Sequence, residues 1–368
     1  MSAGEPAAPA KAPPRTLGLD RIRRTVDAEL HAFLAARTDG LDPAITDTIS
    51  PLAALLMGGK HMRSAFCVWG HTAAGGTGQA DGDGDAVWKV CAALEIFHSL
   101  VLVHDDVVDR SMTRRGMPTT HVHAARMHTE RGWHGDADHY GMSVAICVGD
   151  LLAAWSEELI SQAPAAPEVR LRLHRAFRTM QHDVLCGQLL DLTVQTRRDF
   201  RPEPCTRVAH YKSARYILCP ALSAAGLLAG AGPEVMAAYE RFGTAVGTGY
   251  QIRDDLLGVF GDPARTGKSN TTDLTDGKPS TLIATALANA TPRQAQRIQH
   301  LYGHPGLAED GADELRALIR ATGAGKEAER RIDAHQRDAH RALEEAPLTN
   351  AGRDALLELA DYALRRDH

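Results

Sequence analysis

A long apolar stretch that ends in acidic residues constrains the fold of this chain more than any other feature. Residues 86–110 read AVWKVCAALEIFHSLVLVHDDVVDR, and apolar side chains would occupy most faces of a helix of this length. A helix that is apolar on nearly all sides is buried in the core of a protein. The stretch therefore predicts a central helix that is surrounded by other helices and carries carboxylates at its end.

Helical periodicity also predominates in the rest of the sequence. Residues 19–37, LDRIRRTVDAELHAFLAAR, place apolar side chains three and four positions apart, which is typical of an amphipathic helix. Alternation with period two is scarce, so we expect no sheet. Further helices are expected to begin near Ser143, Glu168, Pro204, Pro233, Thr291, Gly311 and Asn350.

The sequence predicts one large all-α domain over residues 17–368. Glycine and aspartate mark residues 74–85 as a loop, and residues 126–141 form a second looser stretch. No internal repeat or change of composition indicates a domain boundary. Residues 1–16 are rich in Ala and Pro, which predicts a disordered tail and not a signal peptide.

Composition and charge exclude several classes of protein. Apolar residues make up 44% of the chain and charged residues 24%, as is ordinary for a globular protein. The net charge of −5 and the isoelectric point of 6.4 argue against a general nucleic-acid-binding protein. No uninterrupted run reaches the roughly 18–20 apolar residues of a membrane span. The six cysteines form no CxxC pair, so we interpret them as buried residues of a cytoplasmic protein.

Three aspartates, Asp105, Asp106 and Asp109, lie within five residues at the end of the long apolar stretch. Asp105 and Asp109 are four positions apart and would share one face of a helix, with Cβ atoms about 5–6 Å apart. Such close carboxylates repel each other unless a cation lies between them. Mg²⁺ is commonly held by one or two carboxylates together with substrate phosphates. An isolated motif of this kind, however, is more often a solvated acidic helix end.

A second acidic pair strengthens the hypothesis of a metal site. Asp254 and Asp255 lie in the segment YQIRDDLLGVFGD, which predicts a second apolar helix. Two such helices that face each other across one cavity would hold several Mg²⁺ ions between their carboxylates.

Basic residues flank both acidic clusters in a chain that is acidic overall. They lie in the segments GGKHMR, RRG, YKSARY and TGKSN, and they are Lys60, Arg63, Arg114, Arg115, Lys212 and Lys268. Each alone is typical of a surface base. The guanidinium fork and the ammonium group both suit phosphate oxygens, so the set predicts a diphosphate ligand.

These segments together resemble the trans-isoprenyl diphosphate synthases, also called polyprenyl synthetases. The resemblance runs from about residue 58 to residue 282, in that family's order and spacing. It consists of GGKHMR, HSLVLVHDDVVDRSMTRRGMPTTH, GDLL, GQLLDL, YKSARY, YQIRDDLLGVFGD and TGK. A single DDxxD motif would be less specific, because terpene cyclases carry it too.

The resemblance implies an all-helical bundle around a deep central cavity, and it implies a homodimer. It also implies a reaction that depends on Mg²⁺, with three ions in each site when diphosphate is bound. An allylic diphosphate ionises, the double bond of isopentenyl diphosphate attacks the carbocation, and a proton is lost. Charge on the leaving diphosphate requires nearby cations, and the carbocation requires an apolar cavity without water.

The acidic residues of the family match positions of this sequence one by one. The Mg²⁺ ligands match Asp105, Asp109 and Asp254, and Asp106 and Asp255 support these clusters. The resemblance assigns the catalytic set to Asp105, Asp106, Asp109, Lys212, Gln188, Gln251 and Asp254.

The substrate-binding residues match as well. The bases on the allylic diphosphate match Arg114, Lys212 and Lys268. The isopentenyl diphosphate pocket matches Lys60, Arg63, His98 and Arg115. Polar residues near the reacting groups match Gln188, Gln251 and Ser213, the last at a position where the family often has Thr. Outside such a motif, a helical histidine like His98 is more often a core residue with a satisfied ring.

Three departures from the family pattern put details of the site in question. Gly258 holds the last position of the second DDxxD motif, and Asp262 lies one turn further along. The segment SNTTD replaces the Pro and Gly-Asp-Asp that usually follow TGK, although Asp273 keeps one acid there. His61 and Ser64 stand where arginine and proline are common. Because Asp254 remains, we expect activity to survive.

The residues before Asp105 are expected to form the floor on which the growing chain stops. Members that stop at farnesyl commonly have an aromatic residue four or five positions before this aspartate, where Leu100 and Val101 lie here. Phe97 lies eight positions back, about 12 Å along a helix. This arrangement favours geranylgeranyl diphosphate as the product. Farnesyl and longer products remain alternatives, as does a Phe97 that only packs in the core.

Two rival functions follow from the same residues. A class I terpene cyclase ionises the same diphosphate, but it would not need a second diphosphate pocket with Lys60, Arg63 and Arg115. A non-catalytic partner subunit of a synthase is the other rival, since such subunits tend to lose their aspartate motifs. Gly258 and the SNTTD segment keep this second alternative open.

Overall fold

The computed structural model describes residues 17–57, 59–76, 83–263 and 270–366. The predicted tail over residues 1–16 and the predicted diphosphate ligand Lys268 lie outside the described residues. Within them the chain is almost wholly helical, so the prediction of an all-α fold is confirmed.

The first half of the chain forms the helices that surround the predicted central helix. They are α1 (Leu19–Thr38), α2 (Pro43–Ile49), α3 (Leu52–Met57), α4 (Met62–Ala73), α5 (Asp83–Val108), α6 (Thr120–Glu130), α7 (Ala137–Gln162) and α8 (Pro167–Arg197). A short hairpin of β1 (Thr113–Arg114) and β2 (Met117–Pro118) lies between α5 and α6.

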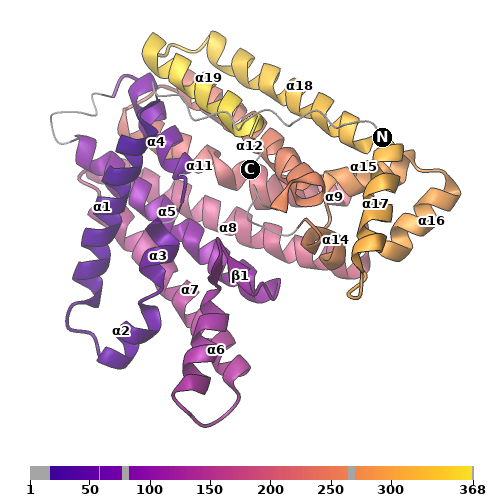
Figure 1. The fold of residues 1–368 in the computed structure, drawn as a ribbon. Helices are drawn as coiled ribbons and strands as arrows, with labels where there is room; N and C mark the ends of the chain where they lie inside the picture. The colour runs from indigo at the N-terminus through magenta and orange to yellow at the C-terminus, as the bar shows by residue number, and fades with distance from the viewer. Residues whose placement is uncertain (1–16, 58, 77–82, 264–269, 367–368) are drawn as a thin grey trace.

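The second half begins with α9 (Pro202–Ala209) and a π-helix, η2 (His210–Ala214). It continues with α10 (Arg215–Ile217), α11 (Cys219–Leu228), α12 (Pro233–Phe260), α14 (Thr272–Asp276) and α15 (Thr281–Asn289). The chain closes with α16 (Pro292–Leu301), α17 (Glu309–Ala321), α18 (Ala324–Glu344) and α19 (Asn350–Leu364). Helices α18 and α19 cover α12, while α6 packs on α7 and projects from the bundle (Figure 1).

Helix α5 is the central helix that its apolar sequence predicts. It contacts α1, α4, α7 and α11, and side chains from all its faces are buried, among them Val90, Leu94, Ile96 and Val103. The segment Asp85–Val108 is apolar and long enough to cross a membrane, but 72% of its most apolar window is buried inside the protein. This burial is that of a core helix.

The predicted boundary of α7 is wrong by six residues. The helix begins at Ala137 and not near Ser143, because the Asp136 side chain accepts hydrogen bonds from the backbone N–H groups of Asp138 and His139. This cap satisfies two N–H groups that the first turn cannot pair. The predicted looser stretch over residues 126–141 is therefore reduced to the connection between α6 and α7.

The expectation that no sheet forms is wrong at one place, the β1–β2 hairpin. Thr113 pairs with Pro118, and Arg114 pairs with Met117. The two residues between the strands, Arg115 and Gly116, have φ angles of 53° and 76°, as a tight turn of the I′ type requires. Strands of two residues are too short to show alternation. The hairpin nevertheless matters, because it carries both arginines of the RRG segment.

The prediction that the cysteines are buried holds for four of the six. Cys67, Cys91, Cys205 and Cys219 are buried, whereas Cys147 and Cys186 are exposed on α7 and α8. None of them is paired in a disulfide.

Candidate active site

The first acidic cluster lies at the end of α5, where two lysines contact it. Lys212 of η2 donates to Asp105 at 3.2 Å and to Asp191 of α8 at 2.5 Å. Burial opposes ionisation of Asp105, but the charges of Lys212 and Lys278 lower the pKa of this carboxyl below its ordinary value. Asp105 is therefore a carboxylate held between cations.

Asp109 follows the last residue of α5, and its backbone N–H still donates to the Asp105 carbonyl at 2.8 Å. The helical turn thus places both side chains on one face, as the four-residue spacing predicts. Lys278, between α14 and α15, donates to the Asp109 carboxylate. Burial and the nearby charge of Asp105 nevertheless raise the pKa of Asp109 to about 6.

The second acidic pair lies on α12. Asp254 is half exposed and accepts a hydrogen bond from Arg366, close to the C-terminus, at 2.5 Å. The Arg366 guanidinium lies 3.8 Å from the centre of the Tyr250 ring, a distance suited to a cation–π contact. Each of the three predicted metal ligands is therefore paired with one basic side chain.

Asp255 is more enclosed than Asp254. It accepts a hydrogen bond from Gln251 at 2.8 Å, and Thr281 donates to it at 3.5 Å. Burial raises the pKa of Asp255 to about 8, and the nearby charge of Asp254 adds to this effect. The surroundings of Asp255 thus favour its protonated form more than those of an ordinary carboxyl do.

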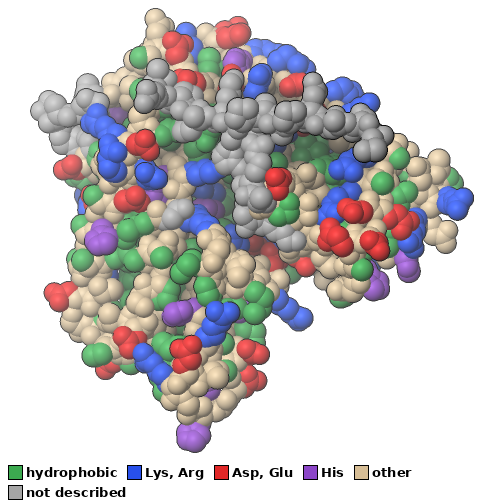
Figure 2. All heavy atoms as spheres, viewed as in Figure 1, with side chains coloured by type: hydrophobic (Ala, Val, Ile, Leu, Met, Phe, Trp, Pro, Cys, Tyr) green, Lys and Arg blue, Asp and Glu red, His purple; other side chains and the backbone are tan. Residues whose placement is uncertain are grey.

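Both acidic clusters face the same segment of chain, which brings them to one site. Lys278 contacts Asp109, and three residues later Thr281 contacts Asp255. In the space-filling view, acidic and basic side chains lie together on the face between α6 and α14 (Figure 2).

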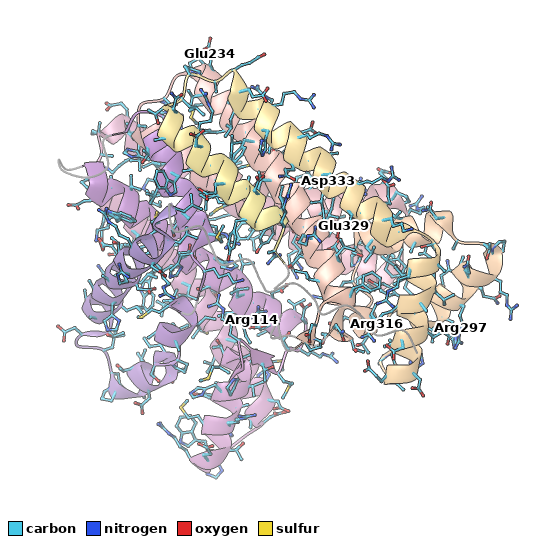
Figure 3. The ribbon with its side chains drawn as sticks, turned by 45° about the horizontal axis from the view of Figure 1, so that its top comes forward. Arg114, Glu234, Arg297, Arg316, Glu329 and Asp333 are labelled. Carbon is cyan, nitrogen blue, oxygen red and sulfur yellow. The ribbon has the colours of Figure 1, made fainter. Side chains whose placement is uncertain are left out.

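Asp106 lies away from this segment and pairs with the hairpin. Arg114 donates to it from Nε, at 2.8 and 3.0 Å, and from Nη2, at 2.6 Å. Asp106 is 3% exposed, so the two hydrogen-bonded nitrogens fix the guanidinium of the half-buried Arg114. Figure 3 labels Arg114 beside the end of α5.

Lys212 reaches the acids because its π-helix packs closely on α8. A Cβ atom at Gly187 would lie 2.5 Å from the Lys212 backbone nitrogen, so only glycine permits this approach. Ser213, next to Lys212, is buried. Gln188 is half-buried on α8, one turn before the lysine partner Asp191.

A second basic group surrounds Tyr216. The Arg63 guanidinium lies 5.1 Å from the ring centre, and the Tyr216 hydroxyl lies 3.0 Å from His98 Nδ1. Burial and the charge of Arg63 hold the pKa of His98 well below its ordinary value. His98 is therefore neutral here. Lys60 is exposed, two residues before the start of α4.

The exposed Arg115 lies close to the loop that precedes α4. Its Nη1 donates to the Leu55 carbonyl at 3.0 Å. A Cβ at Gly59 would lie 3.6 Å from Arg115 Nη2, so the hairpin approaches the loop that precedes α4. The hairpin thus brings Arg115 close to the segment that carries Lys60 and Arg63, about 50 positions earlier in the sequence.

His61, at the position where the family commonly has arginine, lies between two carboxylates. Its Nε2 is 2.8 Å from Asp27, and its Nδ1 is 3.3 Å from Glu95. His61 is 3% exposed and has a left-handed backbone, with φ of 45°. Ser64, in place of proline, donates to Glu95 at 2.8 Å.

The predicted floor residues lie one to two turns below Asp105. Phe97 is 2% exposed, and its ring contacts Phe177 of α8 and Tyr216, with centres 5.6 and 6.1 Å apart. Leu100 is buried and Val101 is half-buried. Phe97 thus belongs to an aromatic cluster that lies one helical turn before the aliphatic pair.

Several site residues were not identified from the sequence. Asp191 and Tyr216 lie inside recognised segments, and their spacing from Gln188 and Lys212 by about one helical turn was the available signal. Lys278 and Arg366 gave no local signal, since each meets the acidic residues through packing of distant segments.

The chemistry of the three predicted metal ligands suits Mg²⁺, but among the residues that the structure describes no three Asp, Glu, His or Cys side chains lie close enough together to hold one ion. Asp105, Asp109 and Asp254 supply carboxylate oxygens, the ligands that this cation prefers. Each of them forms an ion pair with one basic side chain, Lys212, Lys278 or Arg366, so positive charge lies beside each carboxylate.

Comparison with known proteins agrees with this geometry. The family model described as polyprenyl synthetase matches residues 47–319. A geranylgeranyl diphosphate synthase of Mycobacterium tuberculosis is 32% identical over 290 residues, which cover 78% of this chain and 75% of the relative. The octaprenyl diphosphate synthase of Escherichia coli is 28% identical over 310 residues, which cover 84% and 87% of the two chains.

A solved structure is similar over nearly the whole length. It is the geranylgeranyl pyrophosphate synthase from Corynebacterium glutamicum complexed with isoprenyl diphosphate and magnesium, with a TM-score of 0.90 and 32% identity. The match covers 95% of this chain and 99% of that chain. The predicted resemblance is confirmed: this chain belongs to the polyprenyl synthetase family and is a prenyltransferase, a trans-isoprenyl diphosphate synthase.

Proposed function

We propose that this prenyltransferase condenses isopentenyl diphosphate with an allylic diphosphate to make geranylgeranyl diphosphate. The observation that carries the product length is Phe97, which packs on Phe177 and Tyr216 two turns below Asp105. Relatives of this protein are named as synthases of prenyl diphosphates of different lengths, including geranylgeranyl and octaprenyl diphosphate, so membership of the family alone leaves the product length open. A farnesyl product would require a floor closer to Asp105, and the residues there are aliphatic.

The allylic diphosphate is assigned to the site between the two acidic clusters. Asp105, Asp109 and Asp254 would hold Mg²⁺, three ions in each site when diphosphate is bound. Bound Mg²⁺ supplies positive charge that stabilises the leaving diphosphate as its bond to carbon breaks. Lys212, Arg114 and Lys268 add further positive charge to the same oxygens, and Asp106 orients Arg114. Gln188 and Gln251 are assigned to the polar wall of this site.

Isopentenyl diphosphate is assigned to the pocket beside Tyr216. Lys60, Arg63 and Arg115 would bind its phosphates, and a neutral His98 ring would contribute a hydrogen bond without a charge that repels the carbocation. Asp255, which accepts a hydrogen bond from Gln251, would support Asp254 from the adjoining position of α12.

The apolar residues between Asp105 and Phe97 would surround the growing chain. Val101 and Leu100 offer no polar group, so the carbocation would meet no water from this side. Phe97 would end the space, and product length would follow from its distance to the diphosphate.

We expect a homodimer over residues 17–368 of each copy, in the cytoplasm. Exposed apolar side chains on the neighbouring helices α7 and α8 support a second copy of the chain as the partner: Met142, Ile146, Leu185 and Leu189. On each helix the two side chains are four positions apart and share a face. Sedimentation of the Ile146→Glu, Leu189→Glu double variant tests this, because buried charges at the interface should yield a monomer. A variant that stays dimeric would show that another face is used.

A product assay tests the proposal directly. Purified protein receives Mg²⁺, isopentenyl diphosphate and an allylic primer of five, ten or fifteen carbons, with Asp105→Ala as the control. A single twenty-carbon diphosphate that is absent in the control supports the proposal. A cyclic hydrocarbon would favour a terpene cyclase. No elongation with any primer would favour a non-catalytic partner subunit. Gly258 motivates this alternative, because it replaces the last acid of the second aspartate motif.

A further inference from the structure

The second acidic motif lacks its last acid, but another carboxylate occupies that place. A Cβ atom at Gly258 would lie 1.9 Å from Oδ2 of Asp273, a separation that no pair of non-bonded atoms tolerates. Residues 254 and 258 are four apart on α12 and share a face of the helix. The Asp273 carboxylate therefore lies on the face that carries Asp254, where a side chain at position 258 would be.

The segment that carries Asp273 is anchored at its start. Arg316 of α17 is 5% exposed and donates to the Asn270 carbonyl at 3.2 Å, to the Asn270 side-chain oxygen at 2.7 Å and to Thr271 at 3.0 Å. The same arginine donates to the Val259 carbonyl at 3.1 Å. Arg316, labelled in Figure 3, thus ties the segment to the end of α12 beside Gly258.

The segment is also fixed at its other end, across the site. Tyr302 donates to the Lys278 carbonyl, while the Lys278 side chain contacts Asp109. The residues from 270 to 278 therefore form a wall that runs from the second acidic cluster to the first. Asp273 lies on α14 within this wall.

Electrostatic coupling agrees with this position. After burial and the charge of Asp254, the Asp273 charge contributes to the raised pKa of Asp255. It also contributes, after Asp105 and Asp109, to the raised pKa of Lys278. Asp273 acts on groups of both clusters. By contrast, the other acid near the helix end, Asp262, is exposed beyond the last residue of α12.

We propose that Asp273 supplies the carboxylate that position 258 lacks, and that it helps to hold the divalent cation and diphosphate beside Asp254. The inference rests on the proposed function of the site. Mg²⁺ retains several waters, so the carboxylate can act through one of them. The adjoining segment would thus provide, through Asp273, a carboxylate in the space where a side chain at position 258 would lie.

A carboxylate exchange tests this inference. Asp273→Ala removes the carboxylate, and Gly258→Asp, Asp273→Ala returns one to α12. The exchange is sterically feasible, because the Asp273 Cβ would lie 3.7 Å from a Cβ at position 258, an ordinary contact. Gly258→Asp alone should clash with Asp273 and place two carboxylates together.

Binding of Mg²⁺ with inorganic diphosphate, measured by calorimetry, is the primary readout, and turnover is the second. We expect Asp273→Ala to weaken Mg²⁺ binding roughly 10–100-fold, as supporting residues of metal sites do. The double variant should recover most of this loss. Asp262→Ala, the matched removal of a nearby acid, should bind as the unaltered protein does.

Three results would overturn the inference: unchanged binding in Asp273→Ala, no recovery in the double variant, or an equal loss in Asp262→Ala. Thermal midpoints without Mg²⁺ separate misfolding from lost binding, and Asp273→Asn, which keeps the shape, repeats the test if the alanine variant unfolds. Failure of the unaltered protein to bind Mg²⁺ with diphosphate, or to elongate any primer, would instead contradict the proposed function.

Discussion

Arg114 donates hydrogen bonds to the buried Asp106 carboxylate from two of its nitrogens, Nε at 2.8 Å and Nη2 at 2.6 Å. The pair joins the end of α5 to the hairpin that carries the RRG segment. Removal of one partner leaves the other charge buried without compensation, which is more costly than loss of the pair as a whole.

We therefore expect Asp106→Ala to lower the free energy of unfolding by about 3–5 kcal/mol. Urea denaturation measures this. The matched control is Asp47→Ala, which breaks the exposed pair between Asp47 and Arg131, at 2.8 Å, and should cost less than about 1 kcal/mol. Equal losses in the two variants would show that Asp106 and Arg114 form no cooperative buried pair.

The His61 ring should make stability depend on pH. Burial lowers the pKa of His61, but the nearby Glu95 and Asp27 carboxylates raise it above its ordinary value of 6.5 overall. The folded protein therefore favours the protonated ring. This contribution to stability is complete below pH 6.5 and is lost as pH rises through the raised pKa of the folded state.

We expect the difference in free energy of unfolding between the unaltered protein and His61→Asn to shrink between about pH 6 and pH 9. Urea denaturation across this range is the measurement. His61→Lys, which retains a charge above this range, serves as the control and should show no such decline. A difference that stays constant with pH would mean that the ring does not change its protonation there.

Phe97→Leu is expected to lengthen the product. The smaller side chain opens the aromatic layer that Phe97 forms with Phe177 and Tyr216, so the chain can pass further down α5. Chromatography of dephosphorylated products measures the shift, which we expect to be at least one five-carbon unit. Phe66→Leu is the control: Phe66 is fully buried and packs on Phe242 at 6.2 Å. Unchanged product length in Phe97→Leu would assign this ring to core packing alone.

Gly187→Ala should impair catalysis more than stability. The added methyl would push η2 away from α8 and displace Lys212, and a shift of about 1 Å at a catalytic group can cost roughly 100-fold in rate. We expect a drop of about tenfold or more in kcat, measured at saturating substrates. Gly232→Ala is the matched control, because no atom lies within 4 Å of a Cβ there. Equal kcat values in both variants would contradict a close fit of η2.

The sequence by itself determined the class of fold and the nature of the site. Helical periodicity repeats along each segment, so single residues that depart from it do not change the prediction. The stretch that forms α5 is apolar on nearly all sides, which predicts a core helix. Carboxylates four positions apart on a helix must share a face. The acidic clusters, the arginines beside them and the aliphatic pair above Phe97 were accordingly all predicted from residue order. Helix boundaries were less secure, since one capping residue such as Asp136 moves a boundary by several positions.

Tertiary structure alone decided which charges meet. Lys278 and Arg366 reach the acidic residues from segments distant in the sequence, and no local pattern encodes such contacts. The hairpin that presents Arg114 has strands too short for any periodicity, and the π-helix that presents Lys212 depends on the missing side chain of Gly187. In the sequence alone, Gly258 indicates only that the second DDxxD motif lacks its last acid. In three dimensions the space beside it holds the carboxylate of Asp273, because packing and not sequence position determines which side chains share a site.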